Sequence, residues 1–174
     1  LVAKMDGDSL PVSAFVAHAD GTFEQGASAY EKRGVAVMVP EWDETKCIQC
    51  NRCSYVCPHA TIRPFALTEE EVAAAPEGLQ VAKMTGKGLE ALKFTMAVSP
   101  MDCMGCGVCV GECPAKEKAI KMVPRESQEY KQPVFDYLVA NVGKKEGMPA
   151  KETVKGSQFE KPLLEFSGSC AGCA

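Results

Sequence analysis

The sequence predicts a small α+β protein made of two similar halves, with additions at both ends and between the halves. One cysteine pattern, C-x2-C-x2-C-x3-C-P, occurs twice, and an apolar stretch precedes and follows each copy. Short apolar stretches bounded by glycine and proline are typical of strands. Because the order of segments repeats, we expect the halves to be related by a pseudo-twofold axis.

The repeated cysteines are typical of a protein that carries two 4Fe-4S clusters. In two-cluster ferredoxins, the fourth cysteine of each motif ligates the cluster of the other motif. The sequence therefore predicts a ferredoxin-like fold whose halves cannot complete a cluster alone, with electron transfer as its function. The predicted ligand sets are Cys47, Cys50, Cys53 and Cys113 for cluster one, and Cys103, Cys106, Cys109 and Cys57 for cluster two.

Four apolar segments are expected to form the strands of a cluster domain over residues 41–124. Residues 34–40 and 93–100 enter the two motifs, and residues 60–64 and 118–124 leave them. Each half thus reads strand, cluster loop, short helix and strand. We expect each short helix to begin near the Cys-Pro step, because proline is tolerated in the first turn of a helix.

Several residues near the ligands are expected to shape the cluster sites without binding metal. Trp42 is expected to fill the core, and His59 to pack or to hydrogen bond. Glycines among the second set of ligands suit either close backbone approach to the cluster or ordinary turns, and they are Gly105, Gly107 and Gly111. Methionines are expected to pad a cluster pocket, namely Met101, Met104 and Met122.

An insertion over about residues 66–92 separates the two motifs. Thr68 and Glu71 have the spacing of a capping box, and Pro76 and Gly78 mark the end of the helix that it opens. We interpret this segment as an inserted surface helix. Its acidic first turn is expected to complement the helix dipole rather than to receive a redox partner.

The segments outside the cluster domain are an N-terminal segment, residues 1–40, and a C-terminal extension, residues 125–174. The first is expected to wrap the cluster domain, with a strand over residues 10–16 and turns at Gly21 and Gly26.

In the extension, residues 133–141 are predicted to form a helix, with Pro133 near its first position and Gly143 beyond its end. The lysine-rich stretch that continues to Lys161 is expected to be a linker or a covering arm.

Composition narrows the class of protein. The chain has 174 residues, 46% of them hydrophobic, a net charge of -4 and ten cysteines. The cysteines are grouped too regularly for a disulfide framework, and no secretory signal opens the sequence. A zinc site would leave the third cysteine of each group without a role. With no basic patch and no apolar run long enough for a bilayer, we expect a cytoplasmic protein without nucleic-acid or membrane partners.

A separate cysteine pair, Cys170 and Cys173, stands at the end of the sequence. An isolated C-x2-C lacks two of the ligands that a cluster or a structural zinc needs. The pair is therefore either a redox dithiol or part of a site in a longer protein. Because exposed thiols oxidise readily and the sequence stops one residue later, we favour a piece of a longer protein.

Six segments together carry a resemblance to a known family. They are EKRG at 31–34, VPEW at 39–42, CIQCNRC at 47–53, VCPHATIRP at 56–64, MDCMGCGVC at 101–109 and FSGSCAGC at 166–173. The chain resembles pyruvate:ferredoxin (flavodoxin) oxidoreductase over essentially its whole length. The resemblance identifies the family's EKR segment, its inserted ferredoxin-type domain and the start of its thiamine-diphosphate-binding domain.

This resemblance implies a role within a longer enzyme, expected to be a homodimer. Such enzymes decarboxylate pyruvate with thiamine diphosphate and Mg, and form acetyl-CoA, CO2 and reduced ferredoxin or flavodoxin. It implies that Cys170 and Cys173 are two ligands of a third, proximal 4Fe-4S cluster, whose other ligands lie beyond Ala174. The chain itself would relay electrons between clusters and contribute no catalytic residue.

Two other functions remain as alternatives. A freestanding two-cluster ferredoxin explains the repeated motifs but not the EKR segment or the terminal cysteine pair. A ferredoxin-like subunit of another 2-oxoacid oxidoreductase would carry the terminal pair on a different polypeptide.

Overall fold

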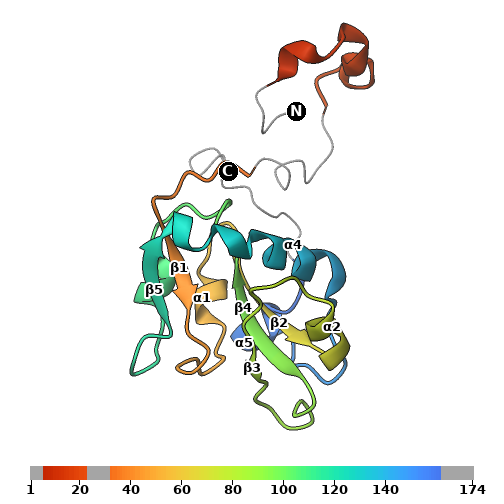
Figure 1. Cartoon of the computed structure of the whole chain (residues 1–174). Coiled ribbons are helices and arrows are strands. Elements are labelled where there is room, and N and C mark those ends of the chain that lie inside the picture. Colours follow the sequence, from red (N-terminus) through yellow and green to blue (C-terminus); the bar gives the residue numbers. More distant parts are fainter. Residues whose placement is uncertain (1–5, 23–31, 162–174) are drawn as a thin grey trace.

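A computed structural model of the chain describes residues 6–22 and 32–161 (Figure 1). Residues 32–161 form the body of the molecule, which is α+β as the sequence predicts. No helix among these described residues is long and apolar enough to cross a membrane.

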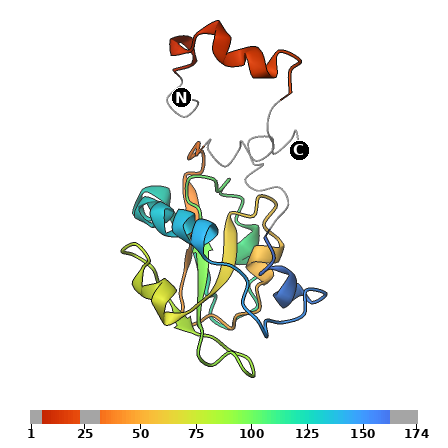
Figure 2. The same ribbon diagram turned by 90° about the vertical axis from the view of Figure 1, so that its right-hand side faces the viewer.

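Two small antiparallel sheets organise the body (Figures 1 and 2). One sheet pairs β1 (Met38–Trp42) with β5 (Ile120–Pro124). In the other, β4 (Lys93–Val98) lies between β2 (Ile62–Leu67) and β3 (Ala82–Lys83). The strand that enters the first motif therefore pairs with the strand that leaves the second, and the two inner strands pair with each other. All four expected strands are present, although β1 begins later than expected and extends to Trp42.

The short helices of the cluster motifs are α1 (Arg52–Tyr55) and α3 (Val108–Gly111). The prediction that they begin near the Cys-Pro steps was wrong, because each helix ends before its fourth cysteine. Proline lacks an N–H group and disfavours helical geometry in the residue before it. Pro58 and Pro114 accordingly follow these helices instead of opening them.

The inserted helix α2 (Glu69–Ala73) begins with the predicted capping box. The Thr68 hydroxyl accepts the Glu71 N–H at 3.3 Å, and the Glu71 carboxylate accepts the Thr68 N–H at 2.8 Å. Lys145 pairs with the same carboxylate at 2.5 Å, and the Tyr137 hydroxyl donates to the Glu71 carbonyl at 3.0 Å. These contacts attach the insertion to the C-terminal extension.

The predicted helix of the extension is confirmed as α4 (Gln132–Asn141), with proline in its first turn. It follows two 3-10 turns, η5 (Arg125–Ser127) and η6 (Glu129–Lys131). Its buried side chains include Phe135, which is fully enclosed, and they pack on residues of β2 and β4. This packing forms one of the cores of the body.

A second core lies beside the cysteine motifs. Phe94 is fully buried there, and its ring meets those of Trp42 and Phe159 edge-on, with centroids 5.9 Å and 6.4 Å apart. Cys53 and Cys109 belong to this core, which the partly buried Cys47 and Cys57 also contact. The motifs are therefore packed against a hydrophobic core rather than carried on free loops.

The lysine-rich stretch after α4 covers the first cysteine motif. It contains a short helix not expected from the sequence, α5 (Val154–Ser157), whose Thr153 hydroxyl accepts the Gly156 N–H at 3.0 Å. The Asn51 side chain donates to the Lys155 carbonyl at 2.9 Å, and Ser54 donates to Gln158 at 2.7 Å. Of the two expected roles, a covering arm is the one that these contacts support.

Residues 6–22 form 3-10 turns, η2 (Gly7–Ser9) and η3 (Val12–His18). The strand expected over residues 10–16 was therefore wrong. A strand needs a partner to satisfy its backbone groups; here the local pattern of the 3-10 helix satisfies them, and the segment lies apart from both sheets (Figures 1 and 2). The turn at Gly21 is present, and Gly26 lies outside the described residues. Farther along the N-terminal segment, Lys32 contacts the cluster domain through its ion pair with Asp102.

We predict that Thr68→Ala weakens α2 locally, because the Glu71 N–H loses its acceptor. Loss of such a cap costs about 1 kcal/mol. Hydrogen exchange at the Glu71 and Val72 amides should show an opening free energy that is lower by this amount. Thr68→Ser keeps the hydroxyl and serves as the control; equal protection in both variants would contradict the role of the cap.

Candidate iron-sulfur cluster sites

Cysteines of both motifs meet around one hollow. Its cysteines are Cys103, Cys106 and Cys109 of the second motif and Cys57 of the first. The rest of the wall is mostly apolar and includes the side chains of Pro40, Ile62, Met104, Val108 and Met122. This is the cysteine set that the sequence predicts for cluster two, and Met104 and Met122 pad its pocket as expected.

The cysteines predicted for cluster one also come together. Cys47 packs against a small cluster that contains Cys113 of the second motif. Burial raises the pKa of the Cys47 thiol, and the neighbouring Cys50 and Cys113 raise it further. Cys53 lies near Cys47 and Cys50 and is buried in the core beside them. The structure thus brings Cys113 to the first motif as it brings Cys57 to the second.

The most enclosed thiols are those of Cys53 and Cys109, each 7% exposed. Burial, followed by the neighbouring thiols, raises the pKa of Cys109 to about 12 and that of Cys53 well above its ordinary range. A site that buries several thiols together favours their ionised form only when positive charge is bound among them. The donor set and its apolar surroundings therefore fit an iron-sulfur cluster.

The two motifs follow the same backbone path. The N–H of Gln49 points to the sulfur of Cys47 at 3.4 Å, and that of Gly105 points to the sulfur of Cys103 at the same distance. Backbone N–H groups aimed at sulfur offset the negative charge of cluster thiolates.

Left-handed backbone angles produce this path, at Gln49 and Asn51 in the first motif and at Gly105 and Gly107 in the second. The first motif adopts this path without glycine. Its Gln49 side chain is instead held by the insertion, donating to the Lys83 carbonyl at 2.8 Å and accepting the Thr85 N–H at 2.9 Å. Sequence reasoning missed this support, which gives the insertion a structural role beside cluster one.

Among these glycines, Gly105 occupies the position where a side chain would not fit. A Cβ there would lie 2.8 Å from the Met38 carbonyl oxygen of β1, whereas one at Gly107 would meet nothing within 4 Å. Gly111 has neither a close neighbour nor a left-handed angle. Of the two explanations weighed for these glycines, close approach holds for Gly105 and a turn for Gly107.

A buried donor without an acceptor lies beside Cys47, one of the cysteines predicted for cluster one. The indole Nε1 of Trp42 is buried and has no hydrogen-bond partner in the described structure. The indole nevertheless lies near enough to Cys47 to lower the pKa of its thiol, against the larger effect of burial. A thiolate at Cys47 would accept this N–H, so the unpaired donor is a further indication of a negatively charged ligand group. Trp42 also fills the core, as expected.

The eight described cysteines are all free thiols, and none of them is in a disulfide. Within the described residues, no group of three or more His, Cys, Asp or Glu side chains is placed to hold a single metal ion. Four of these thiols surround the hollow described above instead of meeting at one point, an arrangement that suits a cluster of several iron atoms. Cys170 and Cys173 lie outside the described residues.

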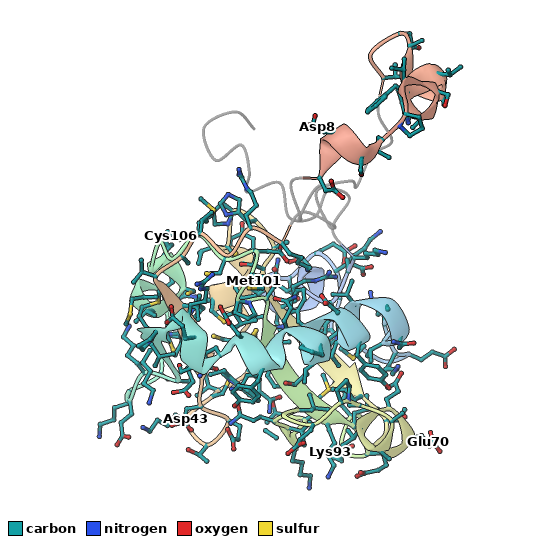
Figure 3. The ribbon with its side chains drawn as sticks, turned by 45° about the horizontal axis from the view of Figure 1, so that its top comes forward. Asp8, Asp43, Glu70, Lys93, Met101 and Cys106 are labelled. Carbon is teal, nitrogen blue, oxygen red and sulfur yellow. The ribbon has the colours of Figure 1, made fainter. Side chains whose placement is uncertain are left out.

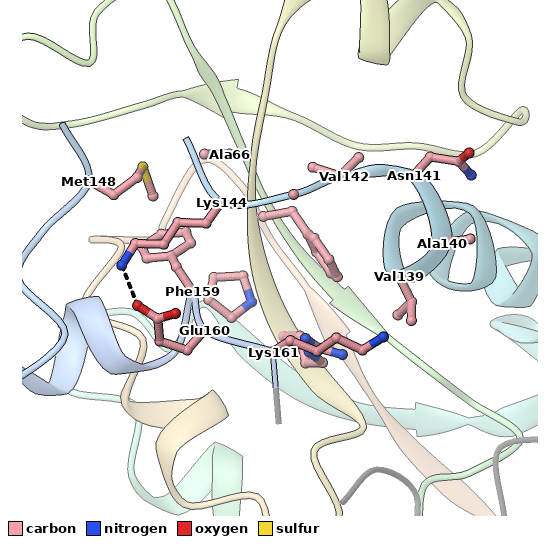
Figure 4. Close-up of a pocket in the computed structure, with 14 residues that line it drawn as sticks. Ala66, Val139, Ala140, Asn141, Val142, Lys144, Met148, Phe159, Glu160 and Lys161 are labelled. Atoms are coloured by element: carbon pink, nitrogen blue, oxygen red, sulfur yellow. Dashed lines mark hydrogen bonds and ion pairs between the residues drawn. The ribbon is translucent and has the colours of Figure 1, made fainter. Parts of the chain in front are cut away.

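A larger hollow, of about 330 Å³, lies elsewhere, between β2, the end of α4 and the segment that reaches Lys161 (Figure 4). Lys144 and Glu160 form an ion pair beside it. No cysteine lines this hollow.

In Figure 3, Met101 and Cys106 lie on one side of the body, and Lys93 and Glu70 lie on the opposite side.

Two parts of the sequence match known protein families. Residues 46–117 match the 4Fe-4S dicluster domain, so the body carries a two-cluster domain of the ferredoxin type. Residues 1–36 match the EKR family, which is described as a domain of unknown function.

Individual relatives then identify the enzyme family. The chain is 52% identical to the pyruvate-flavodoxin oxidoreductase of Enterobacter agglomerans over 98% of its own length, and 53% identical to that of Klebsiella pneumoniae over 96%. It is 49% identical to the pyruvate:ferredoxin oxidoreductase of Moorella thermoacetica over 99% of its length. The chain spans 14% of the length of each of these relatives. The chain belongs to the pyruvate:ferredoxin (flavodoxin) oxidoreductase family, as the motifs indicate, and corresponds to one section of its members.

We predict that Gly105→Ala damages the protein more than Gly107→Ala. Both substitutions place a side chain on a left-handed residue, at a cost of about 1 to 2 kcal/mol. Only Gly105→Ala also forces β1 to move, because of the 2.8 Å approach to Met38. Iron content and the midpoint of thermal unfolding should therefore fall further for Gly105→Ala. Equal losses would show that close approach to β1 does not matter.

Proposed function

We propose that this chain is the internal electron relay of a pyruvate:ferredoxin oxidoreductase. In the proposed reaction, pyruvate, CoA and oxidised ferredoxin or flavodoxin give acetyl-CoA, CO2 and the reduced carrier. The observation that carries the proposal is the hollow lined by Cys57 together with Cys103, Cys106 and Cys109. The identity of about half over nearly the whole chain to named members of the family supports the same role.

The proposed ligation is crossed between the motifs. Cluster one takes Cys47, Cys50, Cys53 and Cys113, and cluster two takes Cys103, Cys106, Cys109 and Cys57. The neighbours of Cys47 support the first set, and the lining of the hollow supports the second. The pairing of β1 with β5 and of β2 with β4, with matched N–H to sulfur contacts in both motifs, supports a pseudo-twofold relation between the halves.

Each cluster, when bound, accepts and passes on one electron at a time. The protein's part is to hold the clusters and to tune their potentials. Four thiolates would hold each cluster, the backbone N–H groups of Gln49 and Gly105 face sulfur, and the apolar wall of the hollow would limit access of water to cluster two. Hydrogen bonds to sulfur and exclusion of solvent are the levers that set a cluster potential.

The remainder of the proposal concerns the parent enzyme. We assign residues 1–40 to the EKR segment, 41–124 to the two-cluster domain and 125–174 to a linker and the start of the thiamine-diphosphate domain. Cys170 and Cys173 would provide two ligands of a proximal third cluster, with thiamine diphosphate and Mg bound elsewhere in a cytoplasmic homodimer. A freestanding ferredoxin is less well supported, because the similarity to long oxidoreductases extends well beyond the cluster domain.

Crossed ligation can be tested with four single variants. Because Cys113 and Cys47 are assigned to one cluster, Cys113→Ala and Cys47→Ala should leave the same remaining EPR spectrum. Cys57→Ala and Cys103→Ala should likewise share a spectrum, that of the other cluster. If Cys113→Ala instead resembled Cys103→Ala, each cluster would be held by its own motif and the assignment would be wrong.

Removal of iron should unfold residues 41–124, because neither half completes a cluster and the buried thiols lie in the core. Chelation under anaerobic conditions should abolish the native circular dichroism, and addition of iron and sulfide should restore it. An iron-free chain that kept its native spectrum would contradict this coupling of cluster binding and folding.

A further inference from the structure

We propose that Lys32, in the signature of the EKR segment, clasps the loop that enters the second motif and raises the potential of the cluster bound there. The inference deepens the proposed function, on which its redox part rests. Its central contact is an ion pair between the Lys32 ammonium and the Asp102 carboxylate, 2.7 Å apart. Asp102 immediately precedes Cys103.

The carboxylate in this pair is enclosed. The Asp102 side chain is 6% exposed, and that of Lys32 is 24% exposed. Lys32 also lies 3.2 Å from Asp136 of α4, so its charge bridges the cluster loop and the helix. Removing one partner of a buried pair leaves an uncompensated charge and is strongly destabilising. Lys32 supplies the positive charge that stabilises this buried carboxylate next to a predicted cluster ligand, and the Ser99 hydroxyl adds a hydrogen bond to it.

Backbone contacts of Gly34 add to the Lys32 ion pair in holding the loop before Cys103; we call these contacts together the clasp. The Gly34 N–H donates to the Met101 carbonyl at 2.8 Å, and the Arg125 guanidinium donates to the Gly34 carbonyl. Gly34 is left-handed, and a Cβ there would lie 2.9 Å from the end of the Met101 side chain and overlap Arg125. The chain after Lys32 is thus fitted closely to the loop before Cys103.

The same carboxylate connects the clasp to the cluster ligand. The Ser99 hydroxyl donates to Asp102 at 2.5 Å, and the Ser99 carbonyl accepts the Cys103 N–H at 3.1 Å. From α4, the Gln132 side-chain oxygen accepts the Met101 N–H at 3.1 Å. Displacement of Asp102 would therefore disturb the residue that carries the first sulfur of cluster two.

The first motif provides an internal comparison. Lys46 immediately precedes Cys47, as Asp102 precedes Cys103, and it pairs with Asp43 at 3.2 Å. That pair is exposed, since the Lys46 side chain is 42% accessible. Exposed pairs contribute little, because water screens them. Lys32 and Lys46 therefore differ in enclosure and in the segment that carries them, which makes Lys46 a matched control.

The positive charge of Lys32 is expected to raise the reduction potential of cluster two. Reduction adds a negative charge to a cluster, so a nearby unpaired carboxylate disfavours it and a nearby ammonium favours it. Lys32→Met should therefore lower the potential of cluster two. We expect the ratio of reduced to oxidised cluster at a fixed solution potential to fall at least threefold, which is about 28 mV at 59 mV per tenfold change for one electron.

The test uses the full chain loaded with iron and sulfide, in an EPR-monitored redox titration. Cluster two is identified as the signal that is absent from Cys103→Ala. Lys32→Met should lower its potential, Lys46→Met should leave it nearly unchanged, and Lys32→Met combined with Asp102→Asn should restore it. Hydrogen exchange at the Gly34 and Met101 amides gives a second readout, with protection lost in Lys32→Met and kept in Lys46→Met and Lys32→Arg.

Each result decides the proposal. An unchanged potential and unchanged amide protection in Lys32→Met would overturn it. A potential that stayed low in the double variant would overturn the electrostatic part and leave only the clasp. If the unaltered chain formed no 4Fe-4S cluster, the proposed function would fail, whereas exchange at Gly34 and Met101 would still decide whether Lys32 is a clasp. Should Lys32→Met not fold, Lys32→Arg and the double variant keep both readouts available.

Discussion

The fold depends on the close approach of the two cysteine motifs, each of which places its fourth cysteine beside the other motif. Cys57 lines the hollow of the second motif, and Cys113 packs with Cys47 of the first. At this approach α1 contacts α3, and the strands that follow the two cysteines, β2 and β5, each pair with a strand of the other half. The sheets are too small to provide a large core of their own, so the packing around the cysteines has to supply much of the enclosure.

The additions to this framework can be understood as supports for the motifs. The insertion holds Gln49, the stretch that contains α5 holds Asn51 and Ser54, and residues from Lys32 to Gly34 hold the loop before Cys103. Each support reaches a residue one to three positions from a cysteine. Rigid placement of ligands and dipoles around a cluster is how a protein adjusts cluster potential without taking part in bond making.

Much of this arrangement could be predicted from the sequence, and the remainder shows where local patterns end. The cysteine spacing, the strand segments, the capping box at Thr68 and Glu71 and the helix with Pro133 are local signals, and the structure contains all of these elements. The start of the motif helices was misplaced because proline occurs both in the first turn of a helix and just beyond its end, and Pro58 and Pro114 stand beyond the end. The contacts of Gln49, Asn51 and Lys32 join residues far apart in the chain, so no local pattern reveals them.

Anomalous diffraction at the iron edge, from crystals of the iron-loaded chain, tests the central claim most directly. The account predicts two separate four-iron sites, one surrounded by Cys47, Cys50, Cys53 and Cys113 and the other by Cys103, Cys106, Cys109 and Cys57. Iron sites bounded by the four cysteines of a single motif would contradict the crossed ligation, and isolated single metal ions would contradict the cluster assignment itself.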